Sequence, residues 1–176
     1  MNSHTNFQAA EGNAITRLLI NRNGLIVGEE RDPETNKASL FAVDITRDSS
    51  LWSNVTIDEP WWFGLIDLTD EAAYLQRYAE GPLPTAAGVT AIDLSSGRVL
   101  WSLPRVAYHQ EAAGEVILLQ QGILQQQYFA VDSRTGEHIR KINVEDLPPR
   151  TETDLRHLSF PSVIAPDETS ATETLS

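Results

Sequence analysis

The chain of 176 residues contains no cysteine. This absence excludes disulfide bonds, thiolate zinc sites, iron–sulfur clusters and a cysteine nucleophile. No run of apolar residues approaches the roughly 20 that a membrane-spanning helix needs. The segment from Met1 to Ala14 has neither the basic start nor the apolar stretch of a signal peptide. From these absences we expect a cytoplasmic protein with no membrane association.

Basic residues are few, and lysine is the rarer of the two kinds. The sequence has 25 acidic and 13 basic residues, for a formal net charge of −12, and only Lys37 and Lys141 are lysines. Nucleic acids and anionic membranes are both recognised through Lys and Arg, so the charge excludes them as partners. Two explanations of the composition stay open: a GC-rich genome that favours arginine codons, or a halophilic host whose salt screens the acidic repulsion.

An internal repeat is the most informative feature that is present. The segment Ala91–Trp101 aligns without gaps to Ala130–Arg140, and another copy lies upstream at Ala42–Trp52. In chain order, Ala42–Trp52 is thus the first copy, Ala91–Trp101 the second and Ala130–Arg140 the third. Their aspartates, which are Asp44, Asp93 and Asp132, are 49 and then 39 residues apart. Periods of this size indicate stacked supersecondary units such as propeller blades.

Each copy predicts a β-hairpin. Apolar residues before the aspartate form a strand, and the aspartate accepts backbone N–H groups in the turn that follows. Gly97 and Gly136 supply a positive φ, and Asp48 takes that position in the first copy, because aspartate enters the left-handed region more readily than most residues. Trp52 and Trp101 then occupy matched positions on the outgoing strand.

The gaps between these hairpins fill with further strands, so the sequence predicts an all-β fold of consecutive antiparallel four-strand meanders. This arrangement resembles an incomplete β-propeller of about three blades. Residues 72–78 form either a strand, which we favour, or a helical turn after Asp70 and Glu71. The predicted strands are 15–20, 25–30, 39–45, 51–57, 61–68, 72–79, 88–94, 98–103, 106–110, 116–120, 123–132 and 137–144.

The composition also predicts the domain organisation. A polar N-terminal segment (1–14) precedes a repeat domain (15–144), whose approximate units are 15–58, 59–104 and 105–144. Residues 145–165 are expected to cover or close a sheet edge. The tail, 166–176, is expected to be disordered because it has too little apolar surface to offset the entropy of ordering.

The pattern Ala-x-Asp-x-x-Ser/Thr-Gly-x-x-x-Trp resembles the tryptophan-docking repeat of β-propellers of the pyrroloquinoline-quinone (PQQ) type. The match is complete at Ala91–Trp101; Arg140 replaces tryptophan in the third copy, and Arg47 and Asp48 replace Ser/Thr-Gly in the first. The resemblance implies that Trp52 and Trp101 dock against a neighbouring sheet. It implies no quinone chemistry, because the quinoproteins arrange about eight blades around their cofactor.

A wider segment carries a second resemblance. The run Glu59–Leu65, which includes a Trp-Trp pair, precedes Leu83-Pro84 and the complete repeat. This order resembles a small bacterial family with no established activity, and the resemblance covers residues 15–144. It implies architecture rather than chemistry.

Trp61 and Trp62 are the best candidates for a binding surface. Adjacent residues on a strand face opposite sides, so one is expected in the core and the other at the surface, unless both faces are covered. An exposed tryptophan beside Asp58 and Glu59 suits a sugar ring or an apolar anchor of a partner.

The sequence offers no catalytic set and no metal or cofactor site. His4, His109, His138 and His157 have no ligand spacing, and no glycine-rich phosphate loop is present. We therefore expect a non-enzymatic protein-interaction or ligand-binding module; the alternative is a carbohydrate-binding or carbohydrate-active protein that uses Trp61 or Trp62. Open sheet edges favour a protein partner or self-association, and a homodimer would supply six blades.

Overall fold

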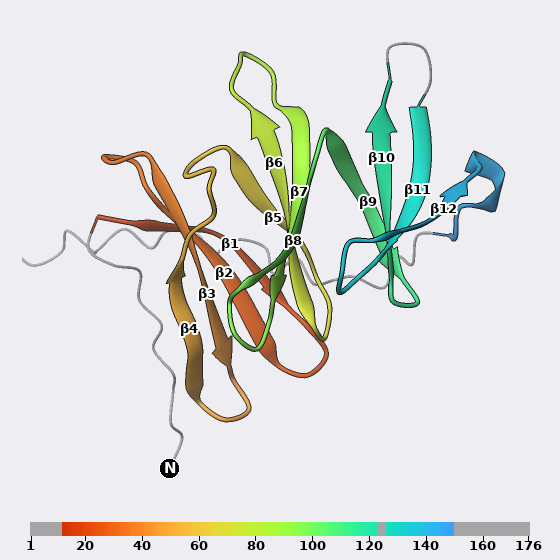
Figure 1. The fold of residues 1–176 in the computed structure, drawn as a ribbon. Coiled ribbons are helices and arrows are strands. Elements are labelled where there is room, and N and C mark those ends of the chain that lie inside the picture. The colour runs from red at the N-terminus through yellow and green to blue at the C-terminus, as the bar shows by residue number, and fades with distance from the viewer. Residues whose placement is uncertain (1–11, 123–125, 150–176) are drawn as a thin grey trace, which may run out of the picture.

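The computed structural model describes residues 12–122 and 126–149. In this part of the chain, twelve strands form three four-stranded antiparallel sheets, and each sheet is a meander of consecutive strands. The all-β fold of four-strand meanders is thus confirmed. The three sheets follow one another in an open row and do not close into a ring (Figure 1).

The strand bounds are as follows. Sheet 1 contains β1 (Ala14–Ile20), β2 (Leu25–Asp32), β3 (Lys37–Asp44) and β4 (Ser49–Val55). Sheet 2 contains β5 (Phe63–Leu68), β6 (Ala72–Ala79), β7 (Thr85–Asp93) and β8 (Val99–Pro104). Sheet 3 contains β9 (Val106–Ala112), β10 (Glu115–Gln121), β11 (Gln126–Asp132) and β12 (His138–Ile142).

Several predicted strand bounds need correction. The predicted strands 25–30 and 39–45 leave a longer connection than the one observed, because Asp32 pairs with Lys37 in the ladder and the Asp32 carboxylate caps the turn through the amides of Glu34 and Thr35. The last predicted strand, 137–144, is shorter than expected: it ends at Ile142, and a short 3₁₀ helix, η1 (Val144–Asp146), follows. Residues 72–79 are a strand, as favoured, and not a helical turn.

The core lies between successive sheets. Apolar side chains of β2 and β3 pack against those of β5, β6 and β7, and a second layer joins β6 and β7 to β9, β10 and β11. The alternation of inward and outward side chains along each strand produces these layers. The fully buried members include Val27, Leu40 and Leu75 in the first layer and Tyr74, Val89 and Leu118 in the second.

The outer face of sheet 3 carries a small third cluster. Ile117, Ala130 and Ile142 are buried there, and Leu147 packs against them. The Gln110 side chain also donates a hydrogen bond to the Pro148 carbonyl, at 3.1 Å. The segment after β12 therefore contacts sheet 3 through Leu147 and Pro148. The predictions for residues 1–11 and 150–176 lie outside the described residues.

The meander places alternate turns at the same end of every sheet. We call this end the turn face; it carries the β1–β2, β3–β4, β5–β6, β7–β8, β9–β10 and β11–β12 connections, at the bottom of Figure 1. The opposite end, the loop face, carries the β2–β3 and β6–β7 connections and the linkers between sheets. Across the described ranges, no helix is long and apolar enough to cross a membrane.

Candidate binding site

The repeat aspartates hold three turns of the turn face. Asp93 Oδ1 accepts the Ser96 amide at 2.7 Å and the hydroxyls of Ser95 and Ser96. Asp44 and Asp132 accept the amides two and three residues ahead in the same way. Hydrogen bonds from these turns hold the pKa of all three carboxyl groups below the ordinary value. The aspartates are therefore ionised caps of these turns.

The repeat tryptophans join each sheet to the next. Trp52 Nε1 donates to the Leu94 carbonyl at 2.8 Å, and Trp101 Nε1 donates to the Ser133 carbonyl at 2.9 Å. A Cβ added at Gly136 would lie 2.7 Å from Cγ of Trp101, so each indole needs a glycine in the next sheet. Gly97 (φ 70°) and Gly136 (φ 72°) also occupy the left-handed region.

The departures from the repeat occur at the two ends of the row. Asp48, in the glycine position of the first copy, has φ 52° and is exposed, so its side chain obstructs no indole. Arg140, in the tryptophan position of the third copy, is exposed and pairs with Glu115 in its own sheet. Sheet 1 thus lacks the glycine, and sheet 3 lacks the tryptophan, that would extend the docking contact beyond the ends of the row. A second protein molecule that packed against either end would have to bind without this contact.

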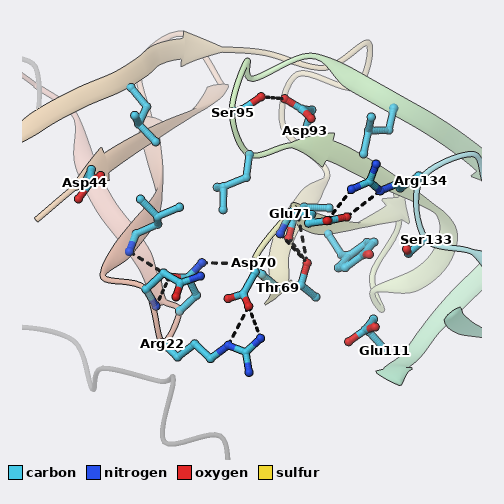
Figure 2. Close-up of a pocket in the computed structure, with 18 of the residues that line it drawn as sticks. Arg22, Asp44, Thr69, Asp70, Glu71, Asp93, Ser95, Glu111, Ser133 and Arg134 are labelled. Carbon is cyan, nitrogen blue, oxygen red and sulfur yellow. Dashed lines mark hydrogen bonds and ion pairs between the residues drawn. The ribbon is translucent and has the colours of Figure 1, made fainter. Parts of the chain in front are cut away.

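A recess of about 1210 Å³ opens on the turn face (Figure 2). It is lined by residues from all three sheets, among them five carboxylates and three guanidiniums. The carboxylates are Asp44, Asp70, Glu71, Asp93 and Glu111, and the guanidiniums are Arg22, Arg47 and Arg134. The recess is therefore acidic.

Two ion pairs cross between sheets at the rim of this recess. Arg22 donates through both Nε and Nη2 to Asp70 Oδ2, which joins sheet 1 to sheet 2. Arg134 donates through Nε and Nη2 to the two oxygens of Glu71, at 2.8 and 2.5 Å, which joins sheet 3 to sheet 2. The hydrogen bond from Arg134 lowers the pKa of the Glu71 carboxyl. Both pairs are well exposed on the arginine side, so each contributes little to stability.

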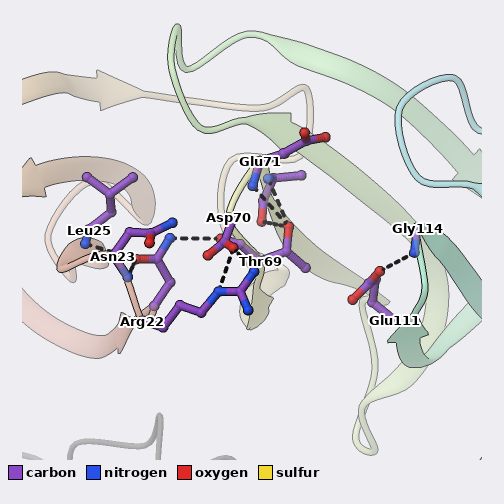
Figure 3. Close-up of polar contacts among 10 residues, drawn as sticks. Arg22, Asn23, Leu25, Thr69, Asp70, Glu71, Glu111 and Gly114 are labelled. Carbon is purple, nitrogen blue, oxygen red and sulfur yellow. Dashed lines mark hydrogen bonds and ion pairs between the residues drawn. The ribbon is translucent and has the colours of Figure 1, made fainter.

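The buried Asn21 fixes the position of the β1–β2 turn. Its side-chain oxygen accepts the amides of Asn23 and Leu25, both at 3.0 Å, and its amide donates to the Thr69 carbonyl of sheet 2 at 3.0 Å. Figure 3 shows this turn facing the β5–β6 turn, with Glu111 and Gly114 on the β9–β10 hairpin beyond them. The recess is thus framed by turns whose positions are set by hydrogen bonds.

An aromatic stack lies behind the recess in sheets 2 and 3. The Tyr74 ring is stacked on that of Tyr108, with centroids 5.4 Å apart, and lies 6.1 Å from the Trp101 ring. The Tyr108 hydroxyl donates to Asp67, and burial raises the pKa of both tyrosines. Both phenols are therefore protonated at neutral pH.

The candidate residues predicted from sequence lie away from the recess, on the loop face. Trp61 and Trp62 precede β5 and are outside any strand, so the expectation that they alternate across a strand is wrong. Glu59 Oε1 accepts the amides of both tryptophans, at 3.1 and 3.0 Å, and this turn keeps them out of the ladder. Both indoles are half-buried, and Asp58 is exposed.

The Arg31 guanidinium lies over the Trp61 ring, 4.8 Å from its centroid. It also donates to the carbonyls of Trp61 and Phe63 and pairs with the buried Glu29 at 2.7 Å. One face of Trp61 is thus occupied by the protein itself, and the Glu59 carboxylate is engaged in a turn. Trp61, Trp62, Asp58 and Glu59 are neighbours in the chain, but none of them lines the recess of the turn face.

The sequence identified the recess residues Asp44 and Asp93 as repeat aspartates, but it did not identify the recess. The charged residues that contribute its ion pairs and its third hairpin come from separate turns and share no motif; they are Arg22, the adjacent Asp70 and Glu71, Glu111 and Arg134. The signal that was available is topological, because in a meander every second turn reaches the same end of the sheet. Within the two described ranges, no three His, Cys, Asp or Glu side chains are grouped to hold a metal ion.

The comparison with protein families adds one finding. A model described as a domain of unknown function, DUF4905, matches residues 20–101, which extend from the end of β1 to Trp101 in β8. The matched region contains most of sheets 1 and 2 and the docking contact between Trp52 and Leu94. Among curated proteins, none matches the chain.

Proposed function

We propose that the chain is a non-enzymatic binding module whose turn face holds a cationic segment of a partner protein. The observation that carries this proposal is the acidic recess lined by all three sheets. Its volume of about 1210 Å³ exceeds the roughly 300–1,000 Å³ of most small-molecule sites, so it suits an extended peptide. The proposal includes a cytoplasmic location and a propeller-like architecture.

Charge supports a basic partner rather than an acidic one. The recess contains more carboxylates than guanidiniums, and the whole chain has a net charge of −12. Arg22 and Arg134 are already paired with Asp70 and Glu71, so they offer little to an anion. Complementary charge steers association and selects partners. A lysine-bearing segment is therefore the expected occupant.

A pair of charge-matched variants tests this function. In the first, Asp70→Asn and Glu71→Gln remove two carboxylates from the recess; the fold should tolerate this, because exposed ion pairs contribute about 0–1 kcal/mol each. We expect this variant to bind a fluorescent peptide of alternating lysine and glycine about ten-fold more weakly, which corresponds to about 1.4 kcal/mol. Fluorescence anisotropy gives the affinity.

The control variant removes the same charge from the loop face, through Glu34→Gln and Glu80→Gln, both of which are exposed. It should bind the peptide within about two-fold of the wild type, since charges beyond a Debye length of about 8 Å are screened at physiological salt. A peptide of alternating glutamate and glycine should not bind either protein. Equal losses in the two variants would mean only unspecific attraction to an acidic surface and would refute the proposal.

A further inference from the structure

The Tyr74 hydroxyl is a buried polar group without a hydrogen-bond partner in the described chain. Tyr74 lies on β6, is fully buried and lines the recess of the turn face. Tyr108, stacked against it, differs in this respect, because its hydroxyl donates to Asp67. Buried hydroxyl groups are almost always hydrogen-bonded, so an orphaned one at a recess points to a ligand.

The neighbouring Thr69 hydroxyl does not satisfy this hydroxyl. Thr69 lies close enough to lower the pKa of the Tyr74 phenol, but no hydrogen bond of good geometry joins the two hydroxyls. The Thr69 hydroxyl accepts the amides of Ala72 and Glu71, at 3.0 and 3.3 Å, and donates to the Ala72 carbonyl at 3.2 Å. A hydroxyl has one donor and two acceptor sites, and these contacts within the β5–β6 turn use them.

Glu111 brings a partly unused carboxylate to the same recess. Its Oε1 accepts the Gly114 amide at 2.8 Å, as Figure 3 shows, and within the described residues its Oε2 accepts no hydrogen bond. The other glutamate of the recess, Glu71, has both oxygens occupied by Arg134. Glu111 therefore brings to the recess a carboxylate that, in the described part of the chain, is not held by an arginine and has one oxygen available for a ligand cation.

The electrostatic environment of the Tyr74 hydroxyl favours a cation. After burial, the charges of Glu111, Asp67 and Glu71 are what raise the pKa of the Tyr74 phenol. All three are acidic, so the charged groups that act on this hydroxyl favour a cation as its neighbour over an anion. An unpaired donor from a positively charged group would be stabilised by both the phenol oxygen and the carboxylate.

We propose that the Tyr74 hydroxyl and the Glu111 carboxylate form a subsite that receives the primary ammonium group of a lysine side chain. This inference rests on the proposed function, since it identifies which group of the cationic segment enters the recess. An ammonium group offers three donors that rotate freely, which suits one phenol oxygen and one carboxylate oxygen. A guanidinium is matched less well, because it prefers both oxygens of a carboxylate and Gly114 already uses one.

Small probes test this subsite directly. N-acetyl-lysine methylamide presents the ammonium group, and N-acetyl-norleucine methylamide presents a similar chain without charge. In a titration followed by amide NMR, the lysine probe should shift the signals of Gly114 and Ser133 in a saturable manner, whereas the norleucine probe should not. Tyr74→Phe and Glu111→Gln should each weaken lysine binding about ten-fold.

Two control variants and a folding check separate a binding role from a structural one. Tyr108→Phe removes a hydrogen-bonded hydroxyl from the same stack, so it should lower thermal stability and retain lysine affinity. Tyr74→Phe should retain thermal stability and weaken lysine binding. Glu34→Gln changes the net charge as Glu111→Gln does and should leave lysine affinity unchanged. Each variant is checked for folding by its melting curve.

The outcomes distinguish this subsite from the wider function. If Tyr74→Phe and Glu111→Gln bind the lysine probe as tightly as the wild type, the subsite is refuted. The proposed function survives that result as long as the lysine–glycine peptide still discriminates between the turn-face and loop-face variants. If the peptide does not discriminate, the proposed function fails by its own test.

Discussion

Replacing Trp101 by alanine is expected to lower the free energy of unfolding by about 3 to 5 kcal/mol, the usual range for a buried tryptophan. The indole is 7% exposed, lies over Gly136 and donates to the Ser133 carbonyl, so it joins sheet 2 to sheet 3. Its removal leaves a cavity between two sheets and an unpaired carbonyl. Urea denaturation followed by far-UV circular dichroism measures the loss.

Two matched substitutions control this prediction. Trp101→Phe keeps an aromatic ring but removes the N–H donor and part of the ring, so its cost should be clearly smaller than that of alanine. Arg140→Ala, at the equivalent position in the third copy, should cost no more than about 1 kcal/mol because its ion pair is exposed. A loss below about 1 kcal/mol for Trp101→Ala would contradict the assigned role of the docking tryptophan.

Replacing Arg31 by methionine is expected to destabilise the fold by about 3 kcal/mol, because breaking a buried ion pair leaves a charge without compensation. The Glu29 side chain is 5% exposed and the Arg31 side chain 20% exposed. Glu29 also accepts the Thr16 hydroxyl at 2.7 Å and the Leu65 amide at 2.8 Å, so it joins sheet 1 to sheet 2 and cannot turn to solvent. Urea denaturation at neutral pH measures this loss.

A double variant shows whether the uncompensated charge is the cause. Adding Glu29→Gln to Arg31→Met removes the lone charge but keeps acceptor and donor groups at that position. The double variant should therefore be more stable than Arg31→Met alone. If it is less stable by the full sum of the two single losses, the two side chains act independently and the ion-pair explanation is wrong.

The sequence predicted the fold through its local signals. The signals of the repeat act within one hairpin or on the next one: an aspartate in all three copies, a glycine in the second and third, and a tryptophan in the first and second. Asp48 adopts φ 52° at the glycine position of the first copy. The strands of the meander follow from short-range alternation and turns. Each of these features depends on residues that are near in sequence, and the antiparallel four-strand meanders are confirmed.

The position of Trp61 and Trp62 could not be predicted from the same signals. Their aromatic character favours a strand, but the Glu59 carboxylate binds both of their amides and delays β5 until Phe63. Arg31, thirty residues upstream of Trp61, then covers one face of its ring. A turn cap and a contact between distant residues decide the outcome here, and neither has a sequence pattern.

The recess was missed for a related reason. Tyr74 alternates inward on β6 as any core aromatic does, and nothing in the sequence shows that its hydroxyl lacks a partner. Glu111 and Arg134 come near to it only because three sheets pack with their turns at one end. Such a site is a property of how the hairpins stack, so it becomes visible only in three dimensions.

The central claim is that a cationic segment binds the turn face. Titrating the ¹⁵N-labelled full chain with the lysine–glycine peptide, and recording the shift of every amide signal, tests it most directly. The largest shifts are predicted in the turns around Arg22, Asp70, Gly114 and Arg134. Largest shifts at the β2–β3 and β6–β7 connections of the loop face, or small shifts spread over the whole acidic surface, would contradict the claim.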